Sequence, residues 1–268
     1  MVDTPPRRDR SISGVALLNR TKQIADAPLV GRAWCSSGVR IRFVKYGHGW
    51  KPAAVDWSST RGRILLEASL LFAQRGYFGT STRDIAEAVK IRQPSLFHHF
   101  QAKYEIFRTL VELDLGPSID QIRRRIDEDS TWGEKLHVVV ACDVREALVQ
   151  PFDARGLYQD AVLGLDEFAA ERKGIALFHE LVEHVIIRGQ EAGEFVDAEP
   201  SFVQRAINGV LFETLREQGG PAGPIREARP LQAADFVLRS LLVDQARLDG
   251  IRKATAGRLE ERETTSAH

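Results

Sequence analysis

The spacing of the apolar residues from Thr60 onward constrains the fold more than any other feature of the sequence. These residues recur at intervals of three and four, and no sustained alternation of apolar and polar residues is present. Intervals of three and four place side chains on one face of an α-helix, whereas alternation would indicate a β-strand. The sequence therefore predicts an all-α protein.

The first two predicted helices have clear ends. The first begins near Thr60 and ends at Gly76, a residue type favoured just after a helix C-terminus. Ser81 begins the second helix, and Asp84 three positions later completes a capping-box pattern and puts a carboxylate at the positive end of the helix dipole. Local chemistry alone therefore predicts both boundaries.

A short third helix is predicted from Gln93 to about His99. Pro94 is tolerated because it lies in the first turn, where a backbone N–H has no acceptor within the helix. A capped helix, a short turn and a second short helix form the pattern of a helix-turn-helix motif, whose last helix enters the DNA major groove. We therefore expect a helix-turn-helix DNA-binding domain over residues 58–103.

The charge distribution fits a polyanion partner at this end of the chain. Residues 1–57 hold 10 Lys and Arg against 4 Asp and Glu, and residues 58–103 hold 7 against 3. Residues 104–268 hold 20 against 30, so the net charges of the three segments are +6, +4 and −10. An uneven but solvated surface would give the same distribution, so charge alone leaves both interpretations open.

The run from Ile64 to Phe107 closely resembles the DNA-binding module of tetracycline-repressor-like (TetR family) transcriptional regulators. The matching elements, in order, are Leu71-Phe72-Ala73, Arg75-Gly76, Thr80-Ser81, Ile85-Ala86, Leu96-Phe97-His98-His99-Phe100 and Lys103. The resemblance implies a homodimer in which each subunit has three DNA-binding helices and about six more that bind an effector and form the dimer interface. Its double-stranded DNA operator is then expected to be a near-palindrome.

The candidate phosphate contacts lie at helix starts. Thr82 and Arg83 open the second helix, where a hydroxyl, a cation and free helix-end amides suit a phosphate oxygen. Lys103 begins a helix, where its charge opposes the helix dipole, so a phosphate partner explains its position better than stability does. The resemblance also places this lysine against the DNA backbone. His98 is a further phosphate candidate.

The candidate base contacts lie on the third helix. Arg92, Gln93 and Ser95 stand at its start, where polar side chains can reach base edges. Phe97 can present its ring to the sugar–phosphate wall or to a thymine methyl group, but it replaces a frequent Tyr of the family. Lys90 stands where many relatives carry Gly, and a left-handed non-Gly residue costs about 1–2 kcal/mol. Arg92 likewise replaces a frequent capping Ser or Thr, so no relative's operator sequence can be assumed.

Residues 104–250 are predicted to form a helical effector-binding and dimerisation domain. Breaks such as Gly116-Pro117 separate helices expected at 103–115, 118–128, 133–149, 154–164, 166–191, 200–217 and 231–249. The apolar stripes of the last two helices can close a monomeric core, whereas the resemblance implies that they build a four-helix dimer interface.

Asp143 is the strongest candidate for an effector contact. It lies on the apolar stripe of the helix at 133–149, where an unpaired carboxylate is expensive to bury. It therefore either pairs with an internal cation or lines a cavity where a ligand or water solvates it. His137, Tyr158, Phe178 and His179 are weaker pocket candidates, because such residues at helical spacing usually belong to the core.

The sequence does not favour an enzyme. His179 and His184 lie five residues apart on one helix, so they diverge by about 140° around its axis and cannot share a metal in the manner of a zinc hydrolase. A phosphate-binding Gly-rich loop, a nucleophile elbow and a catalytic triad are also missing from the sequence. We therefore expect no catalytic residues, no metal site and no cofactor.

The two ends of the chain are expected to lie outside the folded domains. Residues 1–57 are predicted to be a mostly disordered basic extension, or the result of a start site assigned too early, and residues 251–268 a flexible tail. The chain has two cysteines, no apolar signal core and no run long enough for a bilayer. A cytoplasmic protein without membrane contact is expected.

The sequence thus predicts a homodimeric, cytoplasmic transcriptional regulator, a repressor that a small-molecule effector releases from its operator. One alternative is a DNA-binding regulator that activates or needs no effector. The alternative from another class is a helical ligand-binding or hydrolytic protein with an incidental helix-turn-helix.

Overall fold

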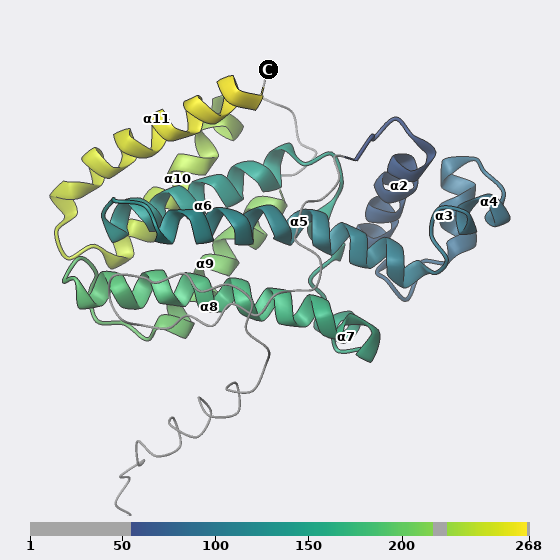
Figure 1. The fold of residues 1–268 in the computed structure, drawn as a ribbon, viewed down its shortest axis with the longest axis horizontal. Helices are drawn as coiled ribbons and strands as arrows, with labels where there is room; N and C mark the ends of the chain where they lie inside the picture. Colours follow the sequence, from purple (N-terminus) through teal and green to yellow (C-terminus); the bar gives the residue numbers. More distant parts are fainter. Residues whose placement is uncertain (1–54, 217–223, 267–268) are drawn as a thin grey trace, which may run out of the picture. The chain divides into compact units, whose positions relative to one another are not determined.

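The computed structural model describes residues 55–216 and 224–266, and this part of the chain is all-α (Figure 1). A single isolated bridge, between Phe195 and Leu242, is its only β-pairing. The elements are α2 (Thr60–Arg75), α3 (Thr82–Val89), α4 (Gln93–Phe97), α5 (Lys103–Ile126), α6 (Trp132–Val149), η1 (Ala154–Gly156), α7 (Asp160–Leu163), η2 (Asp166–Phe168), α8 (Ala169–Glu191), α9 (Pro200–Leu215), α10 (Pro224–Leu241), η3 (Gln245–Arg247) and α11 (Leu248–Ser266).

The predicted ends of the first helices are confirmed. Gly76 has a positive φ of 73° and donates its N–H to the carbonyl of Phe72, so it terminates α2 as a helix C-cap. Ser81 and Asp84 form both hydrogen bonds of a capping box at the start of α3. These two ends set the directions of α2 and α3 through local hydrogen bonds.

The turn between α3 and α4 is left-handed at Lys90, with φ 61° and ψ 44°. Lys90 is the one non-glycine residue with positive φ in the described part of the chain, and its N–H bonds the carbonyl of Ala86. Arg92 then occupies the N-cap position of α4 without a side-chain cap, so the geometry expected from the unusual turn residues is observed.

One long helix joins the DNA-binding helices to the rest of the molecule. A break was predicted at Gly116-Pro117, but α5 runs without interruption from Lys103 to Ile126 with Pro117 inside it (Figure 1). Proline removes a single backbone hydrogen bond. Packing of α5 against α6 and α8, with Leu115 and Ile119 buried, holds the helix together across that gap.

The prediction of a single helix over residues 154–164 is wrong. The segment consists instead of the short helices η1 and α7, and the helix predicted from 166 begins as η2 before α8. Gly156 explains the first break. A Cβ atom there would lie 2.5 Å from the carbonyl carbon of Phe72 in α2, so the segment approaches that helix backbone to backbone.

The C-terminal residues correct a second prediction. The flexible tail expected over residues 251–268 is a helix as far as Ser266, because α11 packs against α6 and α10. Ile251 and Thr255 are buried in that contact. Few apolar residues mark this helix, since part of its buried face is a hydrogen-bonded threonine. In addition, α10 begins at Pro224 rather than at residue 231.

The described fold begins just before α2. Most of the basic extension predicted over residues 1–57, residues 1–54, lies outside the described residues. Trp57 is half-buried, and its ring packs 5.8 Å from that of Phe152. No helix among the described residues combines the length and apolar character of a bilayer span.

We predict that Lys90→Gly stabilises the protein by up to about 1 kcal/mol, because glycine adopts a positive φ without steric cost. The measurement is chemical denaturation followed by circular dichroism. Lys90→Ala is the matched control, since it removes the charge and keeps the strain. An unchanged or lower stability of Lys90→Gly would contradict the prediction.

Candidate DNA interface and effector cavity

The predicted DNA contacts lie on α3, on α4 and at the start of α5. Arg83, Arg92, Phe97 and His98 are exposed, and Phe97 keeps 42% of its surface accessible. Leu96, the neighbouring residue, is fully buried. One face of α4 therefore packs against the protein, and the opposite face is exposed to solvent. That outward face carries the cationic and aromatic side chains expected of a groove-binding helix.

Thr82 and Gln93 are half-buried and contact each other. The side-chain amide of Gln93 donates to the Thr82 hydroxyl over 2.9 Å. Arg63 on α2 donates to the carbonyl of Val89 over 2.5 Å, which ties the end of α3 to α2. These side chains connect α2, α3 and α4, and Ser95 on α4 is half-buried.

Lys103 has a structural role that the sequence did not indicate. Its ammonium donates to the carbonyls of Tyr77 and Thr80 over 2.7 and 2.8 Å and lies 4.0 Å above the Tyr77 ring. Burial lowers the pKa of this amine. An ammonium has three N–H groups, so the two bonds leave one for a phosphate. Lys103 therefore closes the turn between α2 and α3.

Arg61 is a cation near this surface that sequence reasoning missed. Its guanidinium donates to the carbonyl of His99 over 2.8 Å and lies 4.0 Å over the Phe100 ring. It precedes the first apolar residue of α2, so nothing in the helical periodicity indicates a contact 38 residues away.

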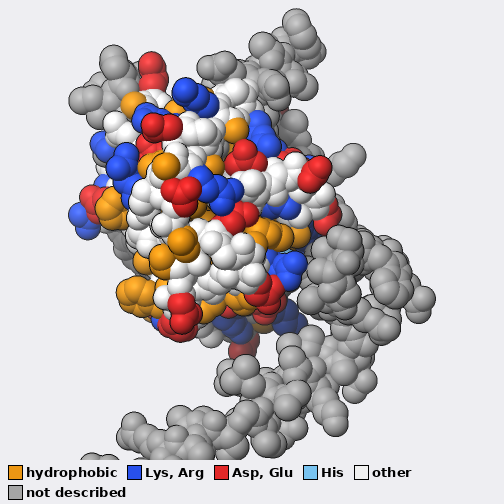
Figure 2. All heavy atoms as spheres, turned by 90° about the vertical axis from the view of Figure 1, so that its left-hand side faces the viewer, with side chains coloured by type: hydrophobic (Ala, Val, Ile, Leu, Met, Phe, Trp, Pro, Cys, Tyr) orange, Lys and Arg blue, Asp and Glu red, His pale blue; other side chains and the backbone are white. Residues whose placement is uncertain are grey.

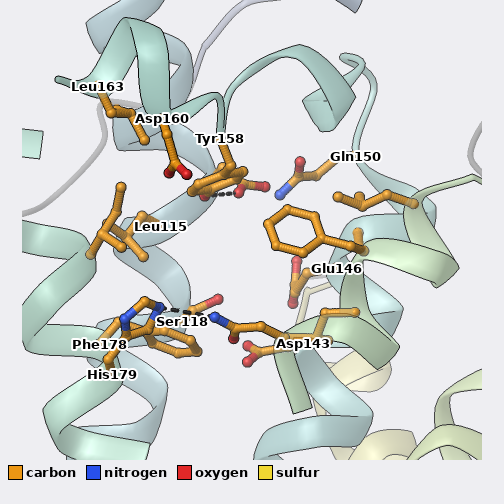
Figure 3. A pocket seen from close by; sticks show the side chains of 17 residues that line it. Leu115, Ser118, Asp143, Glu146, Gln150, Tyr158, Asp160, Leu163, Phe178 and His179 are labelled. Carbon is orange, nitrogen blue, oxygen red and sulfur yellow. Dashed lines mark hydrogen bonds between the residues drawn. The ribbon is translucent and has the colours of Figure 1, made fainter. Parts of the chain in front are cut away.

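A cavity of about 280 Å³ lies between α5, α6, α8, α9 and the segment from Gln150 to Leu163 (Figure 3). Four of the five predicted pocket residues line it: Asp143, Tyr158, Phe178 and His179. The complete lining is Asp114, Leu115, Ser118, Asp143, Glu146, Ala147, Gln150, Tyr158, Asp160, Leu163, Ile175, Phe178, His179, Asn208, Leu211, Phe212 and Leu215.

His137, the fifth predicted pocket residue, does not line this cavity. Its ring is fully buried between α10 and α11, with Nε2 3.0 Å from Asp235 Oδ1 and Nδ1 2.8 Å from the Thr255 hydroxyl. Burial lowers the pKa of the imidazole. Because α6 is buried on several sides, a position on its apolar stripe does not reveal which neighbour it meets.

The sequence left two environments open for Asp143, an internal ion pair or the wall of a cavity. In the structure it lines the cavity. Only 8% of the residue is exposed, and no cation pairs with it among the described residues. Its carboxyl accepts a hydrogen bond from Ser118, while Oδ1 has no hydrogen-bond partner. Burial, followed by the nearby carboxylates of Asp114 and Glu146, raises its pKa to about 7.

Asp114 and Gln150 are cavity residues that the sequence did not indicate. Asp114 accepts hydrogen bonds from the Tyr158 hydroxyl and from the Gln150 side chain, and burial raises its pKa. The amide oxygen of Gln150 has no hydrogen-bond partner. Both residues lie close to predicted helix ends, at Gly116-Pro117 and at Pro151. The helical pattern therefore did not mark them as pocket residues.

The wall of the cavity also contacts the DNA-binding helices. The segment that carries Tyr158 is joined to α2 by a hydrogen bond from the Asp153 N–H to the Ser69 hydroxyl over 3.0 Å, and by the backbone contact at Gly156. Tyr158 itself is held to α5 through Asp114. A few residues therefore connect the cavity wall to α2.

The two histidines that resemble a zinc motif have separate partners. His179 Nε2 lies 3.0 Å from the Asn208 side-chain amide, and the His184 ring packs edge-on against Trp132. Across residues 55–216 and 224–266 no group of His, Cys, Asp and Glu side chains is arranged to hold a metal ion.

Comparison with known proteins identifies the family. The model of the family described as "Bacterial regulatory proteins, tetR family" matches residues 64–110. The chain is 32% identical over 164 residues to the HTH-type transcriptional repressor KstR2 of Rhodococcus jostii, which is 56% of this chain and 78% of that protein.

Two solved structures share the fold. That of Mycobacterium smegmatis AmtR has a TM-score of 0.67 and 25% identity, and the match covers 77% of this chain and 97% of that one. That of AibR in complex with isovaleryl coenzyme A and operator DNA has a TM-score of 0.56 and 19% identity, over 67% and 96% of the two chains. The chain belongs to the TetR family of bacterial regulatory proteins and is a helix-turn-helix DNA-binding transcriptional repressor.

Proposed function

We propose that the protein is a cytoplasmic homodimeric repressor that binds a near-palindromic operator and leaves it when a small molecule occupies the cavity. The observation that carries this proposal is the direct connection between the cavity wall and α2 through Tyr158, Gly156 and Asp153. The AibR structure, which contains an acyl-coenzyme A and operator DNA together, supports the same arrangement of two sites in one fold.

The DNA contacts divide into two groups in this proposal. Arg83 and His98, with Thr82 and the remaining N–H of Lys103, bind phosphates and set the position of the motif. Arg92, Gln93, Ser95 and Phe97 face the groove and read or touch the bases. Gln93 exchanges its bond to Thr82 for a base when it binds.

The dimer interface is assigned to α9 and α10. Phe202 and Phe236 are 62% and 66% exposed on these helices, which is unusual for phenyl rings on a protein surface. A partner subunit that covers them would bury this apolar area. Two copies then hold their recognition helices about 34–36 Å apart, one turn of DNA.

Release of DNA follows if the effector displaces the cavity wall. A ligand that changes the Tyr158–Asp114 contact moves the segment that bonds Ser69 and touches the backbone of Phe72. The effect on DNA is limited to the difference in the effector's affinity for the two conformations. Selection of bound fragments from genomic DNA, followed by a screen for compounds that release them, tests the proposal as a whole. Compounds that bind the cavity without releasing DNA would contradict it.

Arg83→Ala should weaken binding to all DNA sequences and reduce the slope of log affinity against log salt by about one, because it removes one phosphate contact. Arg92→Ala should instead relax the preference at one base position and cost about 1–3 kcal/mol on the operator. Fluorescence anisotropy with operator and random duplexes at several salt concentrations measures both. Equal losses on both duplexes from both variants would contradict the assigned roles.

Phe236→Asp should convert the dimer into monomers, because a carboxylate cannot be buried against the partner. Affinity for a palindromic operator should fall by about 100-fold or more, while affinity for a half-site stays unchanged. Analytical ultracentrifugation and anisotropy measure the two effects. Val149→Asp, at a residue 67% exposed on α6, is the matched control and should remain a dimer.

Ser69→Ala should weaken the coupling between the cavity and DNA. It leaves the Asp153 N–H unpaired at a cost of about 1–3 kcal/mol and loosens the segment from α2. A compound found in the release screen should bind this variant with unchanged affinity but release less DNA. Ser240→Ala, which removes only a bond to its own helix, should behave like the unmodified protein.

A further inference from the structure

Among the Asp, Glu, Lys and Arg side chains, only acidic ones line the cavity. Asp114, Asp143, Glu146 and Asp160 contribute four carboxyl groups, and Figure 3 shows the last three around the cavity. Among the described residues that line this cavity none is Lys or Arg. An anionic ligand would therefore meet repulsion without a compensating cation.

Two buried acceptor atoms of the cavity have no hydrogen-bond donor. Asp143 Oδ1 and Gln150 Oε1 are both buried without a hydrogen-bond partner, and both are acceptors. No donor atom of the described lining residues is in that state. Since buried polar atoms are nearly always paired, a ligand that fits this site brings N–H or O–H groups.

We propose that the cavity binds an organic cation, an apolar body with a protonated amine that donates N–H groups to Asp143 and Gln150. This inference rests on the proposed function of the cavity as the effector site. The volume of about 280 Å³ suits a small ligand, and Phe178, Phe212 and Leu115 provide contacts for its apolar part. A quaternary ammonium carries the charge but has no N–H, so it satisfies only half of the requirement.

The charge of Asp143 makes binding depend on pH. Its pKa of about 7 means that the empty site is partly protonated at neutral pH. The groups that face it are Asp114 from α5 and Glu146 from α6, with Asp160, Tyr158 and His179 around the same cavity, and none is a permanent cation. A bound ammonium stabilises the ionised form, so it displaces the proton. Affinity for the amine should rise from pH 5 to pH 8.

A matched series of probes tests the ligand class. We expect 4-phenylbutylamine to bind more tightly than 4-phenylbutyltrimethylammonium or 4-phenylbutanol, and 4-phenylbutyrate to bind least. Isothermal titration calorimetry of the full chain without DNA measures these affinities. Repeating the amine titration in buffers of different ionisation enthalpy should reveal proton release. No binding of the amine, or binding of 4-phenylbutyrate as tight as that of the amine, would overturn the proposal.

The variant Asp143→Asn tests whether Asp143 binds the amine. It should weaken amine binding roughly 30-fold or more, since one partner of a buried charge pair is removed. Folding of the unmodified protein buries a carboxylate whose pKa rises from 3.8 to about 7, so stability falls as pH increases through that window. Asp143→Asn should therefore melt at a higher temperature than the unmodified protein at pH 8 and at a similar temperature at pH 4, which shows that it is folded.

Asp249→Asn, at an exposed position on α11, is the matched control and should bind the amine normally. Unchanged amine binding by Asp143→Asn would overturn the proposal. Operator release is measured separately by anisotropy. Asp143-dependent binding of the amine without release supports the cation site and contradicts its use as the effector site. Release by 4-phenylbutyrate supports effector control and contradicts the cation.

Discussion

The packing of α5 against both halves of the molecule is the constraint on which the rest of the structure depends. Its first turns place Ile106 and Phe107 in the core of the DNA-binding helices, where the Phe107 ring lies 5.1 Å from Tyr77 and 4.9 Å from Phe168. Farther along the same helix, Asp114 and Ser118 line the cavity. Because the helix continues through Pro117, one rigid element belongs to both sites.

A second group of contacts joins η2 and the start of α8 to this core. The Tyr77 hydroxyl donates to Glu167 over 3.2 Å, and Arg108 on α5 pairs with the buried Glu171 over 3.0 Å. These contacts hold η2 and the start of α8 against α5 and the turn after α2. Apolar side chains are also exposed at the surface of the molecule. Figure 2 shows them in small groups among charged residues on the end of the molecule away from α2–α4.

The polar side chains of the two sites differ in whether they have hydrogen-bond partners within the protein. On the DNA-binding side, Lys103 and Gln93 have hydrogen-bond partners within the protein. In the cavity, Asp143 keeps an unpaired oxygen, and burial with two neighbouring carboxyl groups raises its pKa. Lys103 and Gln93 are therefore held in place by the protein itself, whereas the cavity keeps a buried acceptor without a hydrogen-bond partner.

Local chemistry in the sequence determined the helix ends at Gly76 and Ser81, the left-handed turn at Lys90 and the position of α4, because each depends on hydrogen bonds or steric limits within a few residues. It also marked Asp143 as anomalous. Tertiary structure decided which buried residues meet: it separated His137 from the cavity, brought Asp114 and Gln150 into it, and folded residues 251–266 as a helix. Helical periodicity identifies a buried face, but the neighbour against that face is set by the packing of the whole chain.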